Sequence, residues 1–391
     1  MVDIESAFKD FLHNRESQDL KRQLQVVGRK TARHINVGDQ EYINFSGNDY
    51  LGLTYNAEIT QAIQDGVHQY GAGANASRLI TGHLDVFERT EQKIAAFKQK
   101  EAALIMVSGY QANVSVLAAL FDHKVHKKQP LVFSDKLIHA SMHAGCQAAK
   151  ISQIRFRHND MLHLEELLKN HENEDAPKFI LTETVFSMDG DIAPMNELRA
   201  LADTHNAFLV VDEAHATGVF GMRGEGLGYK ADLVIGTFGK AFGIFGAYIA
   251  CSKTIKDYLV NNCGGLIYAT ALPPSIIAGI DKALDIVPSM TAEREHLQTI
   301  SALLRSGLDK MGYDVGGSQS QIVPMIIGDA GRTIEMSEYL KSQGFWVSAI
   351  REPTVPRGHS RLRFALSAAH KEEDVHNVLN AIADIKTFKV A

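Results

Sequence analysis

Short runs of apolar residues alternate along much of the chain with longer segments in which apolar residues recur every three or four positions. The short runs are rich in β-branched and aromatic residues, which predicts buried strands, and the longer segments predict helices. The expected strands lie at 102–107, 131–133, 179–183, 207–211 and 232–235, and the clearest helices between them at 111–120 and 195–205. Repetition of strand, helix and strand predicts an α/β fold with a mostly parallel sheet covered on both faces.

The pattern changes near Pro288, where long helices begin to alternate with single strands. The expected helices are 291–311, 331–343 and 371–386, and the expected strands are 322–327, 345–350 and 361–366. Residues 1–25 are expected to form one amphipathic helix, with Ile4, Phe8, Phe11 and Leu12 on one face. We therefore expect a large α/β domain over 46–288 and a smaller α+β domain over 289–391, which the segment 1–45 completes.

Reactive side chains directly follow two of the expected strands. Asp212 and His215 lie just beyond the strand 207–211, and Thr237 and Lys240 lie just beyond 232–235. In open α/β sheets, ligands bind at the C-terminal ends of the strands. An acid, an imidazole and a lysine at that edge suit pyridoxal 5′-phosphate (PLP), which needs an imine-forming amine and a carboxylate partner for its ring nitrogen.

Each of these residues also has a structural explanation when it is taken alone. A lone lysine after a strand is usually solvated, and a lone aspartate there usually forms a turn or caps a helix. Asp-Glu-Ala-His is also a helicase signature, but a helicase needs a phosphate loop, and Gly239-Lys240 is followed by alanine instead of Ser or Thr. His139 and His143 have the i, i+4 spacing of a zinc site, yet no Glu lies between them in the H-E-x-x-H pattern and no third ligand is evident, so no metal is expected.

The turn Ser108-Gly109-Tyr110 connects an expected strand to an expected helix. Free N–H groups at a helix N-terminus form a ready phosphate site, and Tyr110 could lie over a ring. In the stretch 44–53, clustered Gly, Asn and Asp predict an irregular loop. The stretch 71–78 is rich in small residues, which allow close approach of the backbone to a ligand or to a second subunit.

Composition and charge narrow the class of protein. The chain has 391 residues, of which 45% are hydrophobic and 22% charged, as is typical of soluble globular proteins. A net charge of −6 gives no basic field for nucleic acid. Three cysteines without a C-x-x-C pair indicate reduced thiols in the cytoplasm. The N-terminal segment has no uninterrupted apolar region and no stretch has the length of a membrane span, so we expect a cytoplasmic protein without a membrane partner.

Three separated motifs carry a family resemblance. They are Asn-Phe-Ser-Gly-Asn-Asp-Tyr-Leu-Gly from residue 44, Asp-Glu-Ala-His-Ala-Thr-Gly from residue 212 and Thr-Phe-Gly-Lys-Ala-Phe-Gly from residue 237. In this order they resemble the α-oxoamine synthases, and the similarity extends from about residue 15 to about residue 385. The resemblance implies a PLP-dependent transferase with the aspartate aminotransferase-like fold.

The resemblance also implies roles around the cofactor. Lys240 would hold PLP as an imine and then act as the base on the substrate Cα–H. Asp212 would pair with the pyridine nitrogen, and His215 would hydrogen-bond the phenolic oxygen. His139 would stack on the ring and help to polarise the incoming carbonyl. The remaining contacts to the ring and phosphate would come from Gly109, Tyr110, Ser187, Thr237 and, across a dimer, Thr270.

Substrate contacts are implied in the same way. Arg351 would bind the substrate carboxylate with its planar guanidinium, assisted by Asn48, and Thr354 would lie at the substrate. The basic residue that serves the acyl donor in the family aligns with Lys21, where arginine is usual, so the adjacent Arg22 is an alternative. The chain also differs from the family at Ala74-Asn75-Ala76, where relatives have more glycine.

Within the family, the segment 349–356 and the following Ser360-Arg361-Leu362-Arg363 most resemble the member that serves biotin synthesis. That member joins L-alanine to a pimeloyl thioester, either pimeloyl-CoA or pimeloyl-acyl carrier protein, with loss of carbon dioxide, and a homodimer is implied. The alternatives are sister enzymes such as glycine C-acetyltransferase, 5-aminolevulinate synthase or serine palmitoyltransferase, and a catalytically silent scaffold subunit. The presence of Lys240 argues against the silent alternative.

Overall fold

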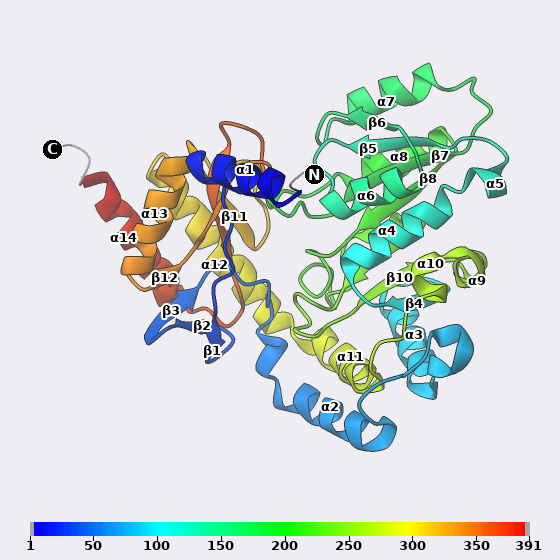
Figure 1. Cartoon of the computed structure of the whole chain (residues 1–391), viewed down its shortest axis with the longest axis horizontal. Helices are drawn as coiled ribbons and strands as arrows, with labels where there is room; N and C mark the ends of the chain where they lie inside the picture. The colour runs from blue at the N-terminus through cyan, green and yellow to red at the C-terminus, as the bar shows by residue number, and fades with distance from the viewer. Residues whose placement is uncertain (1–3, 388–391) are drawn as a thin grey trace. The chain divides into compact units, whose positions relative to one another are not determined.

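The structure, a computed structural model, describes residues 4–387 and contains two compact units (Figure 1). The large unit consists of Asp49–Ser187 and Ile192–Glu295. The small unit consists of the described residues of Met1–Asn48, Met188–Asp191 and His296–Ala391. The domain boundaries expected at residues 45 and 288 remain a prediction, because these units are defined by internal contacts and not by independent folding.

A seven-stranded sheet forms the centre of the large unit, in the order β4-β10-β9-β8-β7-β5-β6 (Figure 1). The strands are β4 (Ala102–Met106), β5 (Leu131–Asp135), β6 (Gln153–Phe156), β7 (Lys178–Glu183), β8 (Ala207–Asp212), β9 (Leu233–Thr237) and β10 (Ala247–Cys251). The pairs β5–β6, β5–β7, β7–β8 and β8–β9 are parallel, whereas β10 runs antiparallel to both of its neighbours. The mostly parallel α/β sheet expected from the sequence is therefore confirmed, with one reversed strand.

The helices of the large unit precede, connect and follow these strands along the chain. They are α2 (Ala57–Tyr70), α3 (Asp85–Phe97), α4 (Gly109–Leu120), α5 (His123–His126), α6 (Ala140–Ala148), α7 (Met161–Asn170), α8 (Met195–Thr204), α9 (Lys253–Asn262), α10 (Gly264–Ile267) and α11 (Pro274–Ile286). Helices α4 and α6 approach closely at Gly145, where a Cβ atom would come within 2.8 Å of the Asn113 carbonyl oxygen. This close contact fixes the two helices relative to each other.

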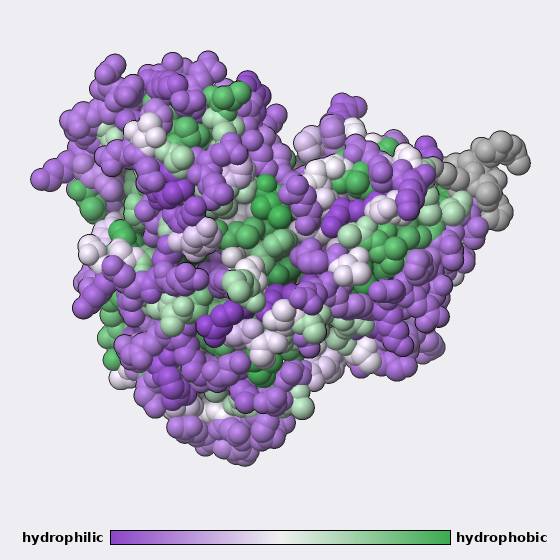
Figure 2. All heavy atoms as spheres, turned by 180° about the vertical axis from the view of Figure 1, so that it is seen from behind, coloured by the Kyte–Doolittle hydropathy of each residue, from purple (hydrophilic) through white to green (hydrophobic). Residues whose placement is uncertain are grey.

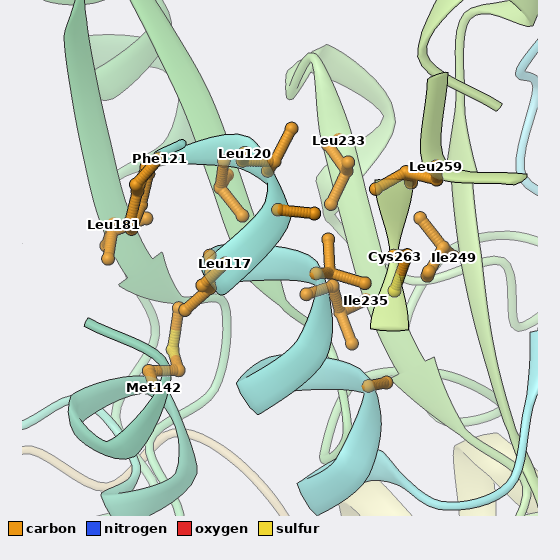
Figure 3. Close-up of a cluster of buried hydrophobic side chains, with 14 of the residues drawn as sticks. Leu117, Leu120, Phe121, Met142, Leu181, Leu233, Ile235, Ile249, Leu259 and Cys263 are labelled. Carbon is orange, nitrogen blue, oxygen red and sulfur yellow. The ribbon is translucent and has the colours of Figure 1, made fainter. Parts of the chain in front are cut away.

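A continuous apolar cluster joins α4 to one face of the sheet (Figure 3). Leu117, Leu120 and Phe121 of this segment pack with Leu181 of β7 and Leu233 of β9, and all five are buried. Burying an apolar side chain of this size contributes about 1.5–3 kcal/mol relative to leaving it exposed. The cluster therefore holds α4 against the sheet whose strand ends carry the candidate site.

The small unit contains two small sheets. The first has the order β1-β2-β3-β12 and the second β11-β14-β13. Their strands are β1 (Gly28–Arg29), β2 (His34–Val37), β3 (Gln40–Asn44), β11 (Ile322–Gly328), β12 (Phe345–Trp346), β13 (Ser348–Ile350) and β14 (Ser360–Ala365), and the helices are α1 (Ile4–Ser17), α12 (Thr291–Lys310), α13 (Ala330–Ser342) and α14 (Glu372–Thr387). The single strand expected over 345–350 is divided, because β12 pairs with β3 and β13 pairs with β14.

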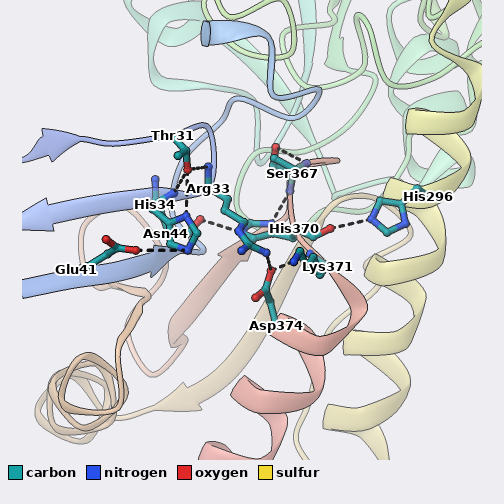
Figure 4. A network of polar contacts seen from close by, with 11 residues as sticks. Thr31, Arg33, His34, Glu41, Asn44, His296, Ser367, His370, Lys371 and Asp374 are labelled. Carbon is teal, nitrogen blue, oxygen red and sulfur yellow. Dashed lines mark hydrogen bonds and ion pairs between the residues drawn. The ribbon is translucent and has the colours of Figure 1, made fainter. Parts of the chain in front are cut away.

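Polar contacts around the buried His370 hold the N-terminal and C-terminal segments of the small unit together (Figure 4). Its Nε2–H donates to the Asn44 carbonyl oxygen at 3.1 Å, and its Nδ1 accepts from the Ser367 N–H at 2.9 Å. The ring stacks on Phe45 with a centroid distance of 4.5 Å. Nearby, Arg33 forms an ion pair of 2.8 Å with Asp374 at the start of α14.

The expectation of one N-terminal helix over residues 1–25 is wrong in its extent. Helix α1 ends at Ser17, and Asp19 adopts a left-handed backbone with φ 56°. The Asp19 N–H donates to the Glu16 carbonyl oxygen and the Leu20 N–H to that of Arg15, which is the Schellman ending of a helix. Residues 1–3 of the expected helix lie outside the described residues.

The predicted apolar face of α1 is exposed and not packed within the chain. Its four members, Ile4, Phe8, Phe11 and Leu12, are between 51% and 67% exposed. Elsewhere the visible face of the molecule is largely hydrophilic, with apolar residues in small groups (Figure 2). Within residues 4–387, every helix is too short or too polar to cross a membrane.

Candidate active site

A cavity of about 200 Å³ lies in the large unit at the C-terminal ends of β7, β8 and β9. The position follows from the fold, since parallel strands present the residues beyond their C-terminal ends at one edge of the sheet. The cavity is lined by Gly109, Tyr110, Asn113, His139, Ser141, Glu183, Asp212, Ala214, His215, Thr237 and Lys240. Seven of the residues expected from the sequence therefore gather around one cavity.

Asp212 ends β8 and is held by two hydrogen bonds. Its Oδ1 accepts from the Ala214 N–H at 2.8 Å, and its Oδ2 accepts from Asn113 Nδ2 at 2.7 Å. The side chain is only 6% exposed. A carboxylate with this restraint keeps a fixed direction, which a partner for a cationic ring nitrogen requires.

His139 caps the N-terminus of α6 and is connected to Asp212 by a chain of side chains. Asn113 Nδ2 also donates to Ser141 Oγ at 2.9 Å, and the Ser141 hydroxyl lies 2.7 Å from His139 Nδ1. Burial lowers the pKa of His139, and Lys240 acts in the same direction, while Asp212 opposes the shift. The ring is therefore neutral at pH 7, with Nδ1 as acceptor and the proton on Nε2.

Lys240 follows β9 in a turn and has a histidine as its nearest polar neighbour. Its Nζ lies 2.7 Å from His215 Nε2, and His215 Nδ1 lies 2.7 Å from the Tyr50 hydroxyl. Tyr50 and Lys240 thus contact opposite nitrogens of one imidazole. This arrangement can move a proton away from or back to the lysine amine.

The start of α4 supplies backbone donors to the same cavity. Ser108 caps the helix, its Oγ accepting from the Gln111 N–H, and Gly109 and Tyr110 form the first turn. Opposite them, Thr237 Oγ1 donates to the Gly246 carbonyl oxygen at 2.9 Å and accepts from the Gly239 N–H. Free N–H groups at a helix N-terminus attract anions, as the phosphate prediction requires.

Two of the expected cofactor residues do not line the cavity in this single chain. Ser187 lies four residues beyond the end of β7 and is partly buried. Thr270 forms an isolated bridge with Ser77 and lines a different, very small cavity beside Arg78. Their predicted roles stay predictions, and for Thr270 the prediction already placed the contact across a dimer.

The expected substrate residues Lys21, Arg22, Asn48, Arg351 and Thr354 all belong to the small unit. Arg351 Nη1 donates to the Asp19 carbonyl oxygen, and Arg22 Nη2 donates to Thr354 Oγ1 at 3.0 Å. Burial lowers the pKa of Arg351, Arg22 adds to the shift, and Asp19 opposes it.

Lys21 forms an ion pair of 3.0 Å with Glu16. Together with Trp346 and Arg351 it contributes to a groove of about 520 Å³ within the small unit. Arg22 thus contacts one of the expected substrate residues, whereas Lys21 is held by an acidic neighbour.

Sequence reasoning missed several residues of the site, namely Tyr50, Asn113, Ser141, Ala214 and Glu183. A signal existed for two of them. Glu183 ends a predicted strand in the same way as Asp212, and Asn113 lies one helical turn beyond Gly109. Tyr50 falls within the loop predicted over 44–53, but its contact with His215 depends on tertiary structure.

The described part of the chain contains no group of three or more His, Cys, Asp or Glu side chains arranged to hold a metal ion. His143, one member of the pair at zinc-like spacing, instead has its Nδ1 2.9 Å from Gln153 Oε1. His139 is occupied by Ser141. The two histidines therefore have separate partners.

Comparison with known proteins places the chain among similar full-length enzymes. The family model for aminotransferases of class I and II matches residues 40–382. A protein of Paramagnetospirillum magneticum, named provisionally as an 8-amino-7-oxononanoate synthase, is 50% identical over 386 residues, or 98% of each chain. An 8-amino-7-oxononanoate synthase of Gluconacetobacter diazotrophicus is 45% identical over 389 residues, again 98% of each chain.

Solved structures give the same fold. A serine palmitoyltransferase from S. paucimobilis with bound PLP and myriocin superposes with a TM-score of 0.90 at 28% identity, covering 97% of each chain. The 8-amino-7-oxononanoate synthase of Francisella tularensis superposes with a TM-score of 0.77 at 27% identity, covering 90% of this chain and 99% of the other.

Proposed function

Since the chain belongs to the class I and II aminotransferase family, and within it to the α-oxoamine synthases, we propose that it uses PLP to condense L-alanine with a pimeloyl thioester. The products are 8-amino-7-oxononanoate, carbon dioxide and the free thiol carrier. The observation that carries the proposal is identity of 45–50% over 98% of the chain to synthases named for this product.

The residues of the cavity fit the cofactor. Lys240 supplies an amine, Asp212 a carboxylate partner, and the start of α4 donors for a phosphate. In addition, two buried oxygen atoms of the lining, Asn113 Oδ1 and Glu183 Oε1, have no hydrogen-bond partner within the described chain. Buried polar atoms rarely stay unpaired in native proteins, so these atoms indicate a polar ligand.

Bound PLP supplies an electron sink for negative charge at the substrate Cα. Lys240 takes the proton from Cα and later returns it, and His215, 2.7 Å from Nζ, receives or restores a proton on the amine. Asp212 keeps the cofactor in one orientation through its two fixed hydrogen bonds. His139, neutral with its proton on Nε2, donates to the carbonyl oxygen of the acyl donor.

Arg351 binds the carboxylate of L-alanine in this proposal and holds it until it leaves as carbon dioxide, with Asn48 as a second contact. Its present partner is a backbone carbonyl, that of Asp19, which a carboxylate can replace because an ionised acceptor makes the stronger hydrogen bond. Arg22 and Lys21, with Thr354, are assigned to the acyl donor. The contact between Arg22 and Thr354 supports Arg22 as the more direct of the two cations.

We further propose that the protein works in the cytoplasm as a homodimer. The three cysteines, Cys146, Cys251 and Cys263, are free and buried, as suits a reducing compartment. Thr270 lies away from the cavity of its own chain, and the dimer would bring it to the phosphate of the partner's site.

The deciding assay offers L-alanine, glycine and L-serine to the purified protein, each with pimeloyl, acetyl, succinyl and palmitoyl thioesters of coenzyme A and of acyl carrier protein. We expect L-alanine with the pimeloyl donor to have the highest kcat/KM. Each buried methylene of the acyl chain contributes about 0.8 kcal/mol, so an acetyl donor should bind several kcal/mol more weakly. If none of the combinations of amino acid and acyl donor gives a product, the result would instead support a silent scaffold subunit.

A second candidate is condensation of L-serine with a palmitoyl thioester. It is favoured by the TM-score of 0.90 to serine palmitoyltransferase against 0.77 to the Francisella synthase. Sequence identity favours the alanine reaction, at 45–50% against 28%. Preference for serine and palmitoyl in the same assay would move the assignment.

A further inference from the structure

Glu183 is a buried acid in the cavity for which the predicted reaction provides no role. It ends β7, is 2% exposed and lines the cavity with Asp212 and Lys240. The Ser187 N–H donates to its carboxyl group, but its Oε1 has no hydrogen-bond partner among the described residues. A buried polar atom without a partner is destabilising, and a purely structural position would avoid that cost with an apolar side chain.

The strand register places this acid directly beside another. Glu183 and Asp212 are partners across the parallel pair β7–β8, so their side chains lie on the same face of the sheet. Asp212 accepts two hydrogen bonds, from Ala214 and Asn113. Because two adjacent buried carboxylates do not both ionise readily, the extra proton belongs on Glu183, the acid with fewer donors.

The surroundings of Glu183 also favour its protonated form on balance. Burial raises the pKa of Glu183 well above its usual range, with Asp212 and then Asp135 adding to the shift, while Lys240 opposes it. Asp135 of β5 has its own partner, since its Oδ1 lies 3.0 Å from His158 Nδ1. Tyr110, His139 and His215 are the other titratable side chains of the lining. His139 Nδ1 lies beside the Ser141 hydroxyl, and His215 contacts Tyr50 and Lys240.

We propose that Glu183, in its neutral carboxylic acid form, is a hydrogen-bond donor to an acceptor atom of the bound cofactor and contributes directly to the affinity for PLP. The inference rests on the proposed function insofar as the cavity holds PLP. It assigns Glu183 a binding role that is separate from that of Asp212, since a neutral donor serves an acceptor atom of the ligand and an ionised carboxylate serves a cationic nitrogen. One acid of the adjacent pair is thereby the donor and the other the charge partner.

The test compares the PLP dissociation constants of the full-length parent protein, Glu183→Gln, Glu183→Ala and Thr182→Val, each stripped of cofactor and titrated with PLP by absorbance. Glutamine retains a neutral donor at the same position, so Glu183→Gln should bind PLP within about threefold of the parent. Glu183→Ala removes the donor and should bind roughly tenfold or more weakly. Thr182→Val is the matched control, because Thr182 is equally buried on the same strand but faces the other side of the sheet.

A pH series separates the neutral donor from an ionised carboxylate. Above the raised pKa the parent's Glu183 ionises, loses its donor proton and repels Asp212, so PLP affinity should fall more steeply in the parent than in Glu183→Gln. Circular dichroism and the melting temperature of the cofactor-free variants report folding independently of PLP.

The outcomes are distinguishable. Equal PLP affinity of the parent and a folded Glu183→Ala would overturn the inference while leaving PLP binding intact. Glu183→Gln binding as poorly as Glu183→Ala would also overturn it, because a neutral donor at this position would then not suffice. A parent protein that does not bind PLP would overturn the proposed function itself.

Discussion

Lys98 and Glu213 form an ion pair behind the turn that presents Asp212, and their side chains are 1% and 0% exposed. Glu213 directly follows Asp212, so its side chain points away from the cavity. Its carboxylate also accepts from the N–H groups of Leu227 and Gly228. The pair therefore anchors the turn Asp212–His215 from the face opposite to the cavity.

Glu213→Gln should destabilise the protein, because it leaves the Lys98 ammonium buried without its countercharge. The expected loss is about 3–5 kcal/mol in the free energy of unfolding, measured by urea denaturation. The double variant Lys98→Met with Glu213→Gln removes both charges and should recover part of the loss. A loss below about 1 kcal/mol in Glu213→Gln alone would show that the pair contributes little.

Lys240 should be the single residue that borohydride reduction joins to the cofactor. Its amine lies beside His215 in the cavity, whereas Lys98 is occupied by Glu213. The purified protein should be yellow, and peptide mass mapping after reduction should find the modification on Lys240 alone. The Lys240→Ala variant should show no covalent label and no turnover, and modification of another lysine would contradict the assignment.

Asp212→Asn should retain PLP but lose activity. The amide carries no charge to hold a proton on the ring nitrogen, and breaking a buried charge pair costs about 3–5 kcal/mol. The measurement is exchange of the α-proton of L-alanine for deuterium by NMR, which isolates proton removal from the later steps. Exchange at the parental rate in this variant would show that Asp212 has another role.

Arg351→Ala should weaken binding of L-alanine by about 1.5–3 kcal/mol, the usual contribution of a hydrogen bond to a charged group. The dissociation constant is read from the absorbance change of the bound cofactor. Arg357→Ala is the matched control, because Arg357 is exposed in the neighbouring loop. Equal alanine affinity in the parent and Arg351→Ala would exclude the assignment.

Binding of the acyl donor should depend on a different residue of the small unit, Arg22. Arg22→Ala removes the cation that contacts Thr354, so the KM for the pimeloyl thioester should rise while alanine binding stays at the parental value. Lys21→Ala should have the smaller effect, because Lys21 is paired with Glu16. If neither change affects the donor, the N-terminal segment does not bind it.

Stability should fall in mild acid because of His370. Burial lowers the pKa of His370 to about 4 from 6.5, and its Nδ1 cannot take a proton while it accepts from the Ser367 N–H (Figure 4). The unfolded chain therefore gains this proton first, so the stabilisation is complete above pH 6.5 and is lost as the pH falls towards 4. The slope is about 1.4 kcal/mol per pH unit, or roughly 3 kcal/mol in total.

The measurement is the free energy of unfolding between pH 4 and pH 7 for the parent, His370→Gln and His376→Gln. His370→Gln should be less stable at pH 7 but should lack most of the acid slope. His376→Gln is the control, since His376 is exposed on α14, the helix that follows His370. The same slope in the parent and in His370→Gln would show that another group causes the loss.

Sequence alone determined the class of the fold and identified seven of the residues that line the cavity. Strand-end residues such as Asp212 and Lys240 could be found because short apolar runs indicate buried strands, and the ends of parallel strands meet at one edge of a sheet. The same rule applied once more would have found Glu183. The family motifs then assigned chemistry to positions whose geometry the residues alone left open.

Tertiary structure decided what depends on contacts between distant segments. Apolar periodicity indicates that a segment is buried, but it does not give the direction of a strand within the sheet. The antiparallel course of β10 was therefore not predictable. The contact of Tyr50 with His215 joins residues 165 positions apart, and no local pattern encodes it. The end of α1 at Ser17 depends on the left-handed backbone of Asp19, whereas the apolar spacing continues through Leu20 and Leu24. Local patterns reflect burial and backbone preference, whereas the partner of each buried polar group is fixed only when the chain packs.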